Sequence, residues 1–138
     1  MQTLLEKLNY KGQKRIALIN AEKKFADLLT EDLKGIVIDT EIDARYPYGF
    51  IIVFVKSIAD VEYLTPITIH NLLADGVLWY CYPKKSSKLY KSDLERDHGW
   101  EALNNSGLIG VRIVSIDDDW SAFRFRNKKF IKSTREKL

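Results

Sequence analysis

Two short apolar runs constrain the fold more than any other feature of the sequence. Residues 50–55 read FIIVFV and residues 77–82 read VLWYCY, and neither run alternates between apolar and polar side chains. A strand with one face in water shows such alternation, whereas a strand covered on both faces does not. Both runs are therefore predicted to be central strands of a sheet that carries helices on each side.

The segments before the first run predict two more strands. The run at 14–20 is short and apolar, and the run at 35–43 is β-branched and alternating. Between them, Phe25 and Leu29 share one face of a predicted helix that Asn20 could cap. This part of the chain therefore has the order strand, helix, strand.

Helices are also predicted on either side of the second apolar run. Before it, Thr65 and Pro66 are typical of a helix start, so the long helical region is predicted to contain two helices. After it, Ser92 and Glu95 have the spacing of a capping box, which predicts a helix near 92–105.

The last two predicted strands, 109–116 and 120–126, are joined only by three aspartates. A connection this short permits only an antiparallel hairpin. The whole order predicts an α/β, three-layer, Rossmann-like fold with a mostly parallel sheet and a C-terminal antiparallel hairpin. Residues 1–127 are predicted to form this single domain and 128–138 a basic tail. The predicted spatial order of the strands is 35–43, 14–20, 50–55, 77–82, 120–126, 109–116.

The composition fits one globular domain. The chain has 138 residues, of which 46% are hydrophobic, enough for a substantial core. Its net charge of +3 is too small by itself to indicate nucleic-acid binding. The single cysteine, Cys81, lies within an apolar run and cannot form an internal disulfide. With no apolar run of about 20 residues and no signal-peptide pattern, we expect a cytoplasmic protein without a membrane partner.

Several segments together resemble a family of short bacterial proteins of unknown function, which is similar to a trimmed class I methyltransferase fold. The segments are YKGQKRIALINA, VFVKS, DGVLWYCYPKKSSK, SDLERDHGW and IDDDWSAFRFR, and the resemblance covers about residues 8–127. It implies a Rossmann-like sheet that ends in an antiparallel hairpin. It implies no established reaction, so no catalytic residue is assigned.

The resemblance also raises the question of a cofactor, which stays unknown. Methyltransferases of this class carry a glycine-rich turn after the first strand, where the backbone approaches S-adenosylmethionine. The corresponding loop here, residues 20–24, contains no glycine, which disfavours that cofactor. Asp39 and Asp43 nevertheless lie about 20 residues further on, near the usual position of a ribose-binding carboxylate.

Ligands of open parallel sheets bind beyond the carboxyl ends of the strands. The predicted fold gathers five loops at that edge: 20–24, 39–45, 56–57, 83–91 and the hairpin turn 117–120. The sequence PKKSSK lies in the fourth of them, and its side chains could bind an anionic, phosphate-bearing molecule. The candidates are Lys84, Lys85 and Lys88 for charge and Ser86 and Ser87 for hydrogen bonds. The simpler alternative is a solvated loop whose lysines pair with the hairpin aspartates.

The hairpin turn supplies two more ligand-binding candidates. Asp117 ends a strand at the sheet edge, and Trp120 is expected to cover the edge of the core. Three adjacent aspartates rarely converge on one metal ion, and neither His70 nor His98 has partners at metal-ligand spacing. No metal site is therefore predicted.

These observations lead to three alternative hypotheses about function. The first is a non-catalytic binding or regulatory module for an anionic ligand at the carboxyl edge. The second is a degenerate methyltransferase-like or nucleotide-acting enzyme that uses Asp39 or Asp43. The third is a nucleic-acid-associated protein that uses Arg124, Arg126 and the basic tail. The sequence does not predict an oligomeric state.

Overall fold

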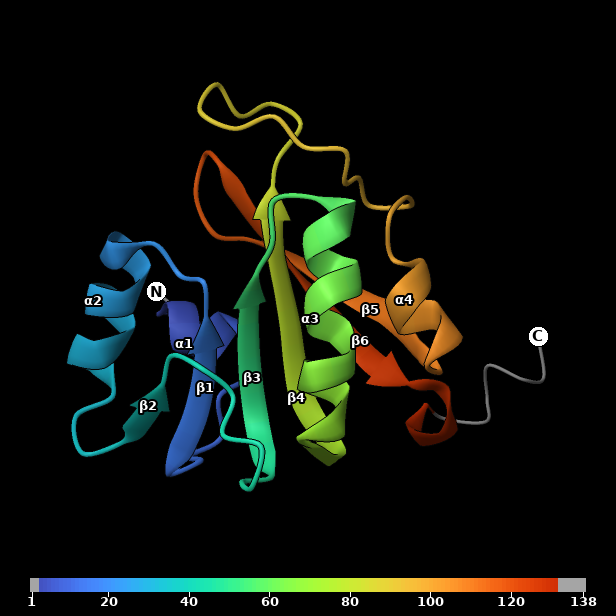
Figure 1. The fold of residues 1–138 in the computed structure, drawn as a ribbon. Helices are drawn as coiled ribbons and strands as arrows, with labels where there is room; N and C mark the ends of the chain where they lie inside the picture. The colour runs from blue at the N-terminus through green and yellow to red at the C-terminus, as the bar shows by residue number, and fades with distance from the viewer. Residues whose placement is uncertain (1–2, 132–138) are drawn as a thin grey trace.

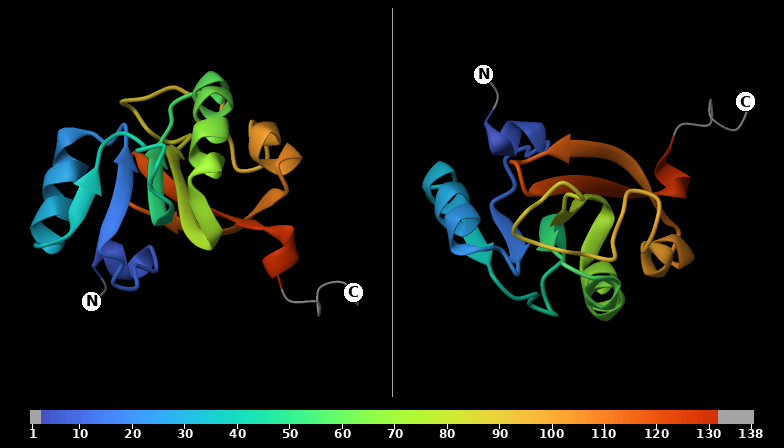
Figure 2. Two further views of the ribbon diagram at one scale, coloured as in Figure 1. Left: turned by 60° about the horizontal axis from the view of Figure 1, so that its bottom comes forward. Right: turned by 90° about the horizontal axis from the view of Figure 1, so that it is seen from above.

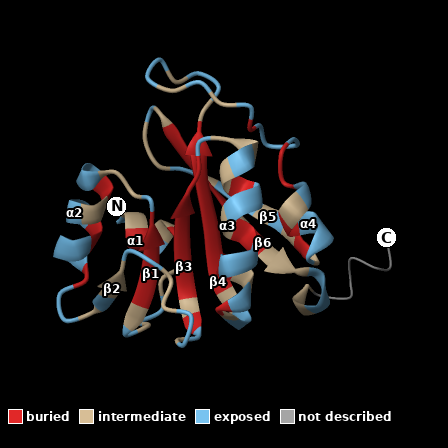
Figure 3. Ribbon diagram, in the orientation of Figure 1, coloured by how far each residue is buried: buried red, intermediate tan, exposed pale blue. Residues whose placement is uncertain are grey.

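The two apolar runs form the centre of a six-stranded sheet, as predicted (Figure 1). The computed structural model describes residues 3–131. Every residue of the runs 50–55 and 77–82 is buried, and Figure 3 shows this burial along the central strands. The strands are β1 (Arg15–Ile19), β2 (Val37–Asp39), β3 (Tyr48–Phe54), β4 (Leu72–Pro83), β5 (Leu108–Ser115) and β6 (Trp120–Asn127).

The strand order is β2-β1-β3-β4-β6-β5, which confirms the predicted order. The first four strands are parallel, while β6 is antiparallel to both β4 and β5. The fold is therefore a Rossmann-like α/β fold with an antiparallel part at one side. The helices are α1 (Leu4–Lys7), α2 (Lys23–Asp32), α3 (Ile58–His70), α4 (Glu101–Asn105) and the 3-10 helix η1 (Lys128–Phe130).

The sheet separates two hydrophobic cores. One lies under α1 and α2 and includes Phe25, Trp79 and Trp120, and the other lies under α3 and α4 and includes Tyr80 and Trp100. Figure 2 shows these helices on opposite sides of the sheet. Burial of one large apolar side chain contributes about 1.5–3 kcal/mol, so both layers stabilise the central strands.

The helical region after β3 is one helix, so the prediction of a second helix starting at Pro66 was wrong. Ser57 accepts a hydrogen bond from the Asp60 amide and caps α3, which continues through Pro66. Thr65 does not cap a helix, because its hydroxyl lies in the core, 2.9 Å from the hydroxyl of Tyr80. Buried residues of α3 lie both before and after Pro66. Their packing outweighs the tendency of Thr65 and Pro66 to begin a new helix.

The predicted helix at 92–105 was also largely wrong, because only Glu101–Asn105 is helical. The Ser92 hydroxyl accepts a hydrogen bond from the Leu94 amide, and not from the Glu95 amide that the predicted capping box requires. Leu94 and Trp100 are buried, and Gly99 between them has a φ of +105°. Residues 84–100 therefore form a long irregular connection. Its second half is held against the core by the buried side chains of Leu94 and Trp100.

The connection between β2 and β3 contains no helix. Residues 40–47 instead pass across β1 on the face that α3 also covers (Figure 1). Ile42 and Tyr46 pack there against the same core as Ala17 and Ile19 of β1. A polar loop thus occupies a position where a doubly wound sheet would normally carry a helix.

We expect Gly110→Ala to destabilise the fold by about 1–3 kcal/mol, because a β-carbon at this position would lie 2.2 Å from Cζ of the buried Phe123. Urea unfolding would measure this loss. Gly49→Ala is the matched control, since its β-carbon would meet its nearest neighbour at an ordinary 3.5 Å. Equal losses in the two variants would contradict this packing.

Candidate functional site

The hairpin turn joins the loop after β4 at the carboxyl edge. Because β4 and β5 are both antiparallel to β6, they run in the same direction and end at the same edge. The amide of Lys84 donates to the carbonyl oxygen of Asp119 at 2.8 Å, and Lys24 reaches Asp117 at 3.3 Å. Figure 2, right, shows the connection after β4 passing over the strand ends. The predicted meeting of 20–24, 83–91 and 117–120 is thus confirmed.

A hollow of about 460 Å³ lies beside this loop. Its polar side chains are Lys84, Lys85 and Lys91 with Ser87, Tyr90 and Ser92, and Pro83 and Leu94 complete the lining. Two of the predicted ligand-binding residues, Ser86 and Lys88, are exposed and do not line it. The hollow therefore contains three of the five candidates from PKKSSK.

The two lysines nearest the strand have partners within the protein. Lys84 donates from Nζ to the Ser115 hydroxyl at 2.6 Å, and Lys85 pairs with Glu95 at 3.0 Å. The partner of Lys85 is thus not one of the hairpin aspartates. Since both members of this pair are substantially exposed, the pair contributes at most about 1 kcal/mol. Lys85 can exchange this partner for an anion at small cost.

The hydroxyl of Ser87 makes hydrogen bonds that determine the conformation of the loop. Its hydroxyl donates to Asp119 at 2.7 Å and accepts from the amides of Leu89 and Tyr90 at 3.1 and 3.2 Å. These contacts fix the turn after Lys84 and direct the chain back over the sheet edge. The serine therefore helps to position the neighbouring Tyr90.

Tyr90 is the residue that closes the carboxyl edge. Its hydroxyl donates to the carboxylate of Glu22 in the loop after β1, and its ring lies 5.2 Å from the ring of Trp120. Nζ of Lys56, in the loop after β3, lies 4.8 Å from the Tyr90 ring centroid. The hydrogen bond to Glu22, together with burial, raises the pKa of Tyr90 to about 12. No sequence motif indicated Tyr90, Glu22 or Lys56, although the fold rule placed their loops at this edge.

Trp120 and Asp117 contribute packing and hydrogen bonds at the same edge. Trp120 is fully buried and contacts Phe25 and Phe54, so it covers the core edge as expected. Within the described part of the chain its indole nitrogen has no hydrogen-bond partner. Asp117 accepts from the amides of Asp119 and Trp120 at 2.8 Å each, which makes it the residue that forms the hairpin turn.

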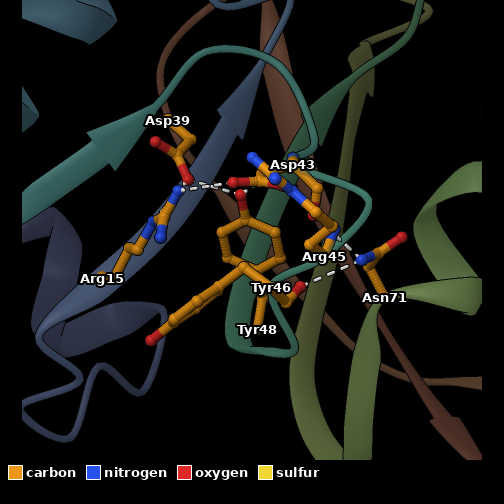
Figure 4. Close-up of polar contacts among 7 residues, drawn as sticks. All are labelled: Arg15, Asp39, Asp43, Arg45, Tyr46, Tyr48 and Asn71. Atoms are coloured by element: carbon orange, nitrogen blue, oxygen red, sulfur yellow. Dashed lines mark hydrogen bonds and ion pairs between the residues drawn. The ribbon is translucent and has the colours of Figure 1, made fainter.

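Asp39 and Asp43 form a second, separate cluster around Arg15 (Figure 4). Arg15 donates from Nε to Asp39 at 2.7 Å and from a terminal nitrogen to Asp43 at 3.2 Å. The buried Tyr48 donates its hydroxyl to Asp39 and accepts from the amide of Asp43 at 3.0 Å. The guanidinium of Arg15 also lies 4.2 Å from the centroid of the Tyr46 ring.

This cluster turns away from the carboxyl edge, so the expectation that 39–45 joins the other loops there was wrong. Asn71, at the end of α3, donates to the carbonyl oxygens of Asp43 and Tyr46 at 3.0 and 2.9 Å. Because the amide of Tyr48 in turn donates to the Asn71 carbonyl, the loop is held near the start of β3. The charged and aromatic contacts with Arg15 explain why the chain turns back here.

Three residues of this cluster have shifted pKa values. The pKa of Asp43 lies below its ordinary value, chiefly because its carboxylate accepts from the Arg45 amide and also from Arg15. The hydrogen bond to Asp39 raises the pKa of Arg15, and burial raises that of Tyr48. The lowered pKa of Asp43 favours its carboxylate form, and the raised pKa of Arg15 favours its charged guanidinium. A ribose-binding role for Asp39 would require a ligand to displace Arg15 and Tyr48.

Tyr48→Phe should lower the free energy of unfolding by about 2 kcal/mol, because a bond to a carboxylate is lost inside the protein. Urea titrations of the two proteins would give the difference. Tyr46→Phe is the control, because the Tyr46 hydroxyl has no partner within residues 3–131 and its ring remains under Arg15. A loss as large in Tyr46→Phe would contradict the role assigned to the Tyr48 hydroxyl.

Other reactive side chains do not form a site. Both His70 and His98 are exposed, and the second lies in the irregular connection rather than on a helix. Cys81 is buried, and burial raises its pKa, which disfavours the nucleophilic thiolate. No group of three or more potential metal ligands occurs among the described residues.

The arginines of β6 are partly neutralised. Arg126 makes two hydrogen bonds of 2.7 Å to Asp75, whereas Arg124 has a buried Nε without a partner in the described residues. Trp120 is buried and so cannot stack on a base beside them. The basic tail lies mostly outside the described residues, apart from η1 and Ile131.

The Asp75–Arg126 pair should make stability depend on pH. Its hydrogen bonds hold the pKa of Asp75 below the ordinary value, so the folded state gains stability above about pH 4 and loses it as the pH falls further. We expect Asp75→Asn to cost about 1 kcal/mol at pH 7 and progressively less below pH 4.

Denaturant titrations between about pH 2.5 and 7 would measure this dependence. Asp118→Asn, at an exposed position of the hairpin turn, should leave the stability unchanged at every pH. A difference between Asp75→Asn and the native protein that stays constant with pH would contradict the coupling.

Comparison with solved structures identifies the fold. The chain is similar to a phosphoethanolamine N-methyltransferase 2 of Haemonchus contortus in complex with S-adenosyl-L-methionine, with a TM-score of 0.54 and 13% identity over 96% of this chain and 38% of that one. It is similar to the fibrillarin pre-rRNA processing protein of Methanococcus jannaschii, with a TM-score of 0.51 and 13% identity over 84% of this chain and 67% of that one. A putative type 11 methyltransferase of Sulfolobus solfataricus gives a TM-score of 0.50 and 11% identity over 91% and 89% of the two chains.

These likenesses show that the chain has a trimmed form of the class I methyltransferase fold, as the sequence resemblance implied. At these identities the comparison extends to the fold alone. No protein-family model matches the chain, and no curated protein matches its sequence. No helix in residues 3–131 is long and apolar enough to cross a membrane.

Proposed function

We propose that the protein is a non-catalytic binding module that holds a phosphate-bearing ligand in the hollow beside the loop after β4. The observation that carries the proposal is the presence of three lysines around one hollow of about 460 Å³. Lys84, Lys85 and Lys91 each offer an ammonium group, and Ser92 offers a hydroxyl. Lysine binds phosphate as a point charge, which requires no glycine-rich loop.

The state of the carboxyl edge supports a binding module over an S-adenosylmethionine-dependent enzyme. The loop after β1 has no glycine, and its Glu22 is bound by Tyr90 from the protein's own connection. Tyr90 thus lies between the ends of β1 and β3, where a nucleotide cofactor of an open α/β sheet would bind. Asp39, the candidate ribose ligand, is held by Arg15 and Tyr48.

The second candidate is a methyltransferase-like enzyme, and the fold favours it. Two of the similar structures are methyltransferases, and one of them contains S-adenosyl-L-methionine. Binding of this cofactor here would require Tyr90 to leave Glu22 and the connection 84–100 to open. The two candidates therefore predict different responses of the same loop.

Titration of the ¹⁵N-labelled protein separates them. Pyrophosphate should shift the amide signals of residues 83–92 in a saturable way, whereas S-adenosylmethionine should leave residues 19–23 unchanged. Lys85→Gln with Lys91→Gln should weaken pyrophosphate binding at least about tenfold, since two charges at the hollow are lost. Lys88→Gln, in the same loop but outside the hollow, is the matched control.

Absence of pyrophosphate-induced shifts at 83–92 would overturn the binding module. Saturable shifts at 19–23 and around Asp39 with S-adenosylmethionine, but not with pyrophosphate, would favour the enzyme alternative. Equal weakening by Lys88→Gln would show that binding depends on general charge and would contradict a site in the hollow.

A further inference from the structure

Strand β5 forms an open edge of the sheet. It is the last strand of the sheet and pairs with β6 on one side only. Apart from the ladder with β6, the backbone of residues 109–115 makes no hydrogen bond to the rest of the described chain. A long strand with one unpaired side is a template for pairing with another extended chain.

The register of the hairpin determines which backbone groups face outward. The amide of Ile116 donates to the carbonyl of Trp120 at 3.0 Å, and the pairing then continues regularly from Ser115 to Arg112. Bonded and non-bonded pairs alternate along an antiparallel ladder. The amides and carbonyls of Ile113 and Ser115 therefore point to the open edge and are available to a new strand.

A shallow hollow adjoins the edge on the α4 face. It has a volume of about 350 Å³, and its lining includes the apolar Ile113 and Phe123 together with the charged Arg96 and Asp97. Ile113 is 37% exposed and so leaves apolar surface open beside the hollow. A strand added beside β5 could place apolar side chains in this hollow.

The opposite face of the same edge is positively charged. Arg112 lies directly opposite Arg124 in the ladder, and like charges in this position are destabilising. Neither arginine has a salt bridge to another described residue, while the neighbouring Arg126 is already bound by Asp75. Acidic side chains on an added strand would relieve this repulsion.

We propose that β5 is the docking edge for an extended segment of a partner protein with alternating side chains, acidic toward Arg112 and Arg124 and apolar toward Ile113. Successive side chains of a strand point to opposite faces, so one alternating segment satisfies both faces at once. The main-chain bonds supply affinity and the two faces supply selectivity. This proposal does not depend on the ligand at the carboxyl edge.

The same features disfavour a second copy of this chain as the occupant. Antiparallel pairing of two β5 strands in one continuous sheet would place both arginine pairs on the same face and add to the repulsion. The bulge between Gly110 and Arg112 further limits regular pairing to residues 112–115. Charge and bulge together restrict the edge to short acidic segments.

The test uses a synthetic peptide, acetyl-Glu-Val-Glu-Ile-Glu-Val-amide, and the ¹⁵N-labelled protein. Binding should shift the amide signals of Ile113 and Ser115 and slow their hydrogen exchange. Ile113→Pro removes an amide that faces the edge, without a loss from the β6 ladder, and should abolish binding. Ile113→Thr keeps that amide and a β-branched side chain and should still show the shifts.

Arg112→Glu should weaken the peptide at least about fivefold, while Lys34→Glu, the same change at an exposed position after α2, should not. The peptide with lysine in place of glutamate should not bind. The proposal is overturned by equal binding of the two peptides, by unchanged binding in Ile113→Pro, or by shifts confined to residues outside 108–116. It is also overturned if sedimentation shows a dimer that Ile113→Pro converts to monomer, because the occupant would then be a second copy.

Discussion

The antiparallel pairing of β6 with β4 determines where the candidate binding surfaces of this protein lie. Because β6 reverses the direction of the chain, β5 ends at the same edge as β4, and the turn between β5 and β6 meets the loop after β4. The backbone bond from Lys84 to Asp119 and the Ser87–Asp119 bond then direct that loop back over the sheet. The contact between Tyr90 and Glu22 follows from this course of the chain.

The result is a methyltransferase-like fold whose carboxyl edge is covered by its own connection. The same connection that brings Tyr90 onto Glu22 also forms the lysine-lined hollow. The second surface, at β5, arises because the hairpin leaves this strand with a neighbour on one side only. Both surfaces thus depend on the antiparallel part of the sheet rather than on its parallel half.

The sequence was sufficient for the sheet because burial on both faces leaves a pattern in FIIVFV and VLWYCY, and because the three hairpin aspartates allow one connection only. It was insufficient where tertiary contacts override local signals. Buried Leu94 and Trp100 hold an irregular chain where Ser92 and Glu95 predicted a helix. Arg15, which is distant in sequence, binds Asp39 and Asp43 away from the carboxyl edge. The contact between Tyr90 and Glu22 is not indicated by any local sequence pattern.

We propose that Tyr90 closes the edge at which a cofactor of an open α/β sheet would bind. Nuclear Overhauser effects between the ring protons of Tyr90 and Trp120 test it most directly, since these rings lie 5.2 Å apart. We expect these effects to be present in the free protein and to persist at saturating S-adenosylmethionine. Their absence from the free protein, or their loss on addition of S-adenosylmethionine, would contradict it.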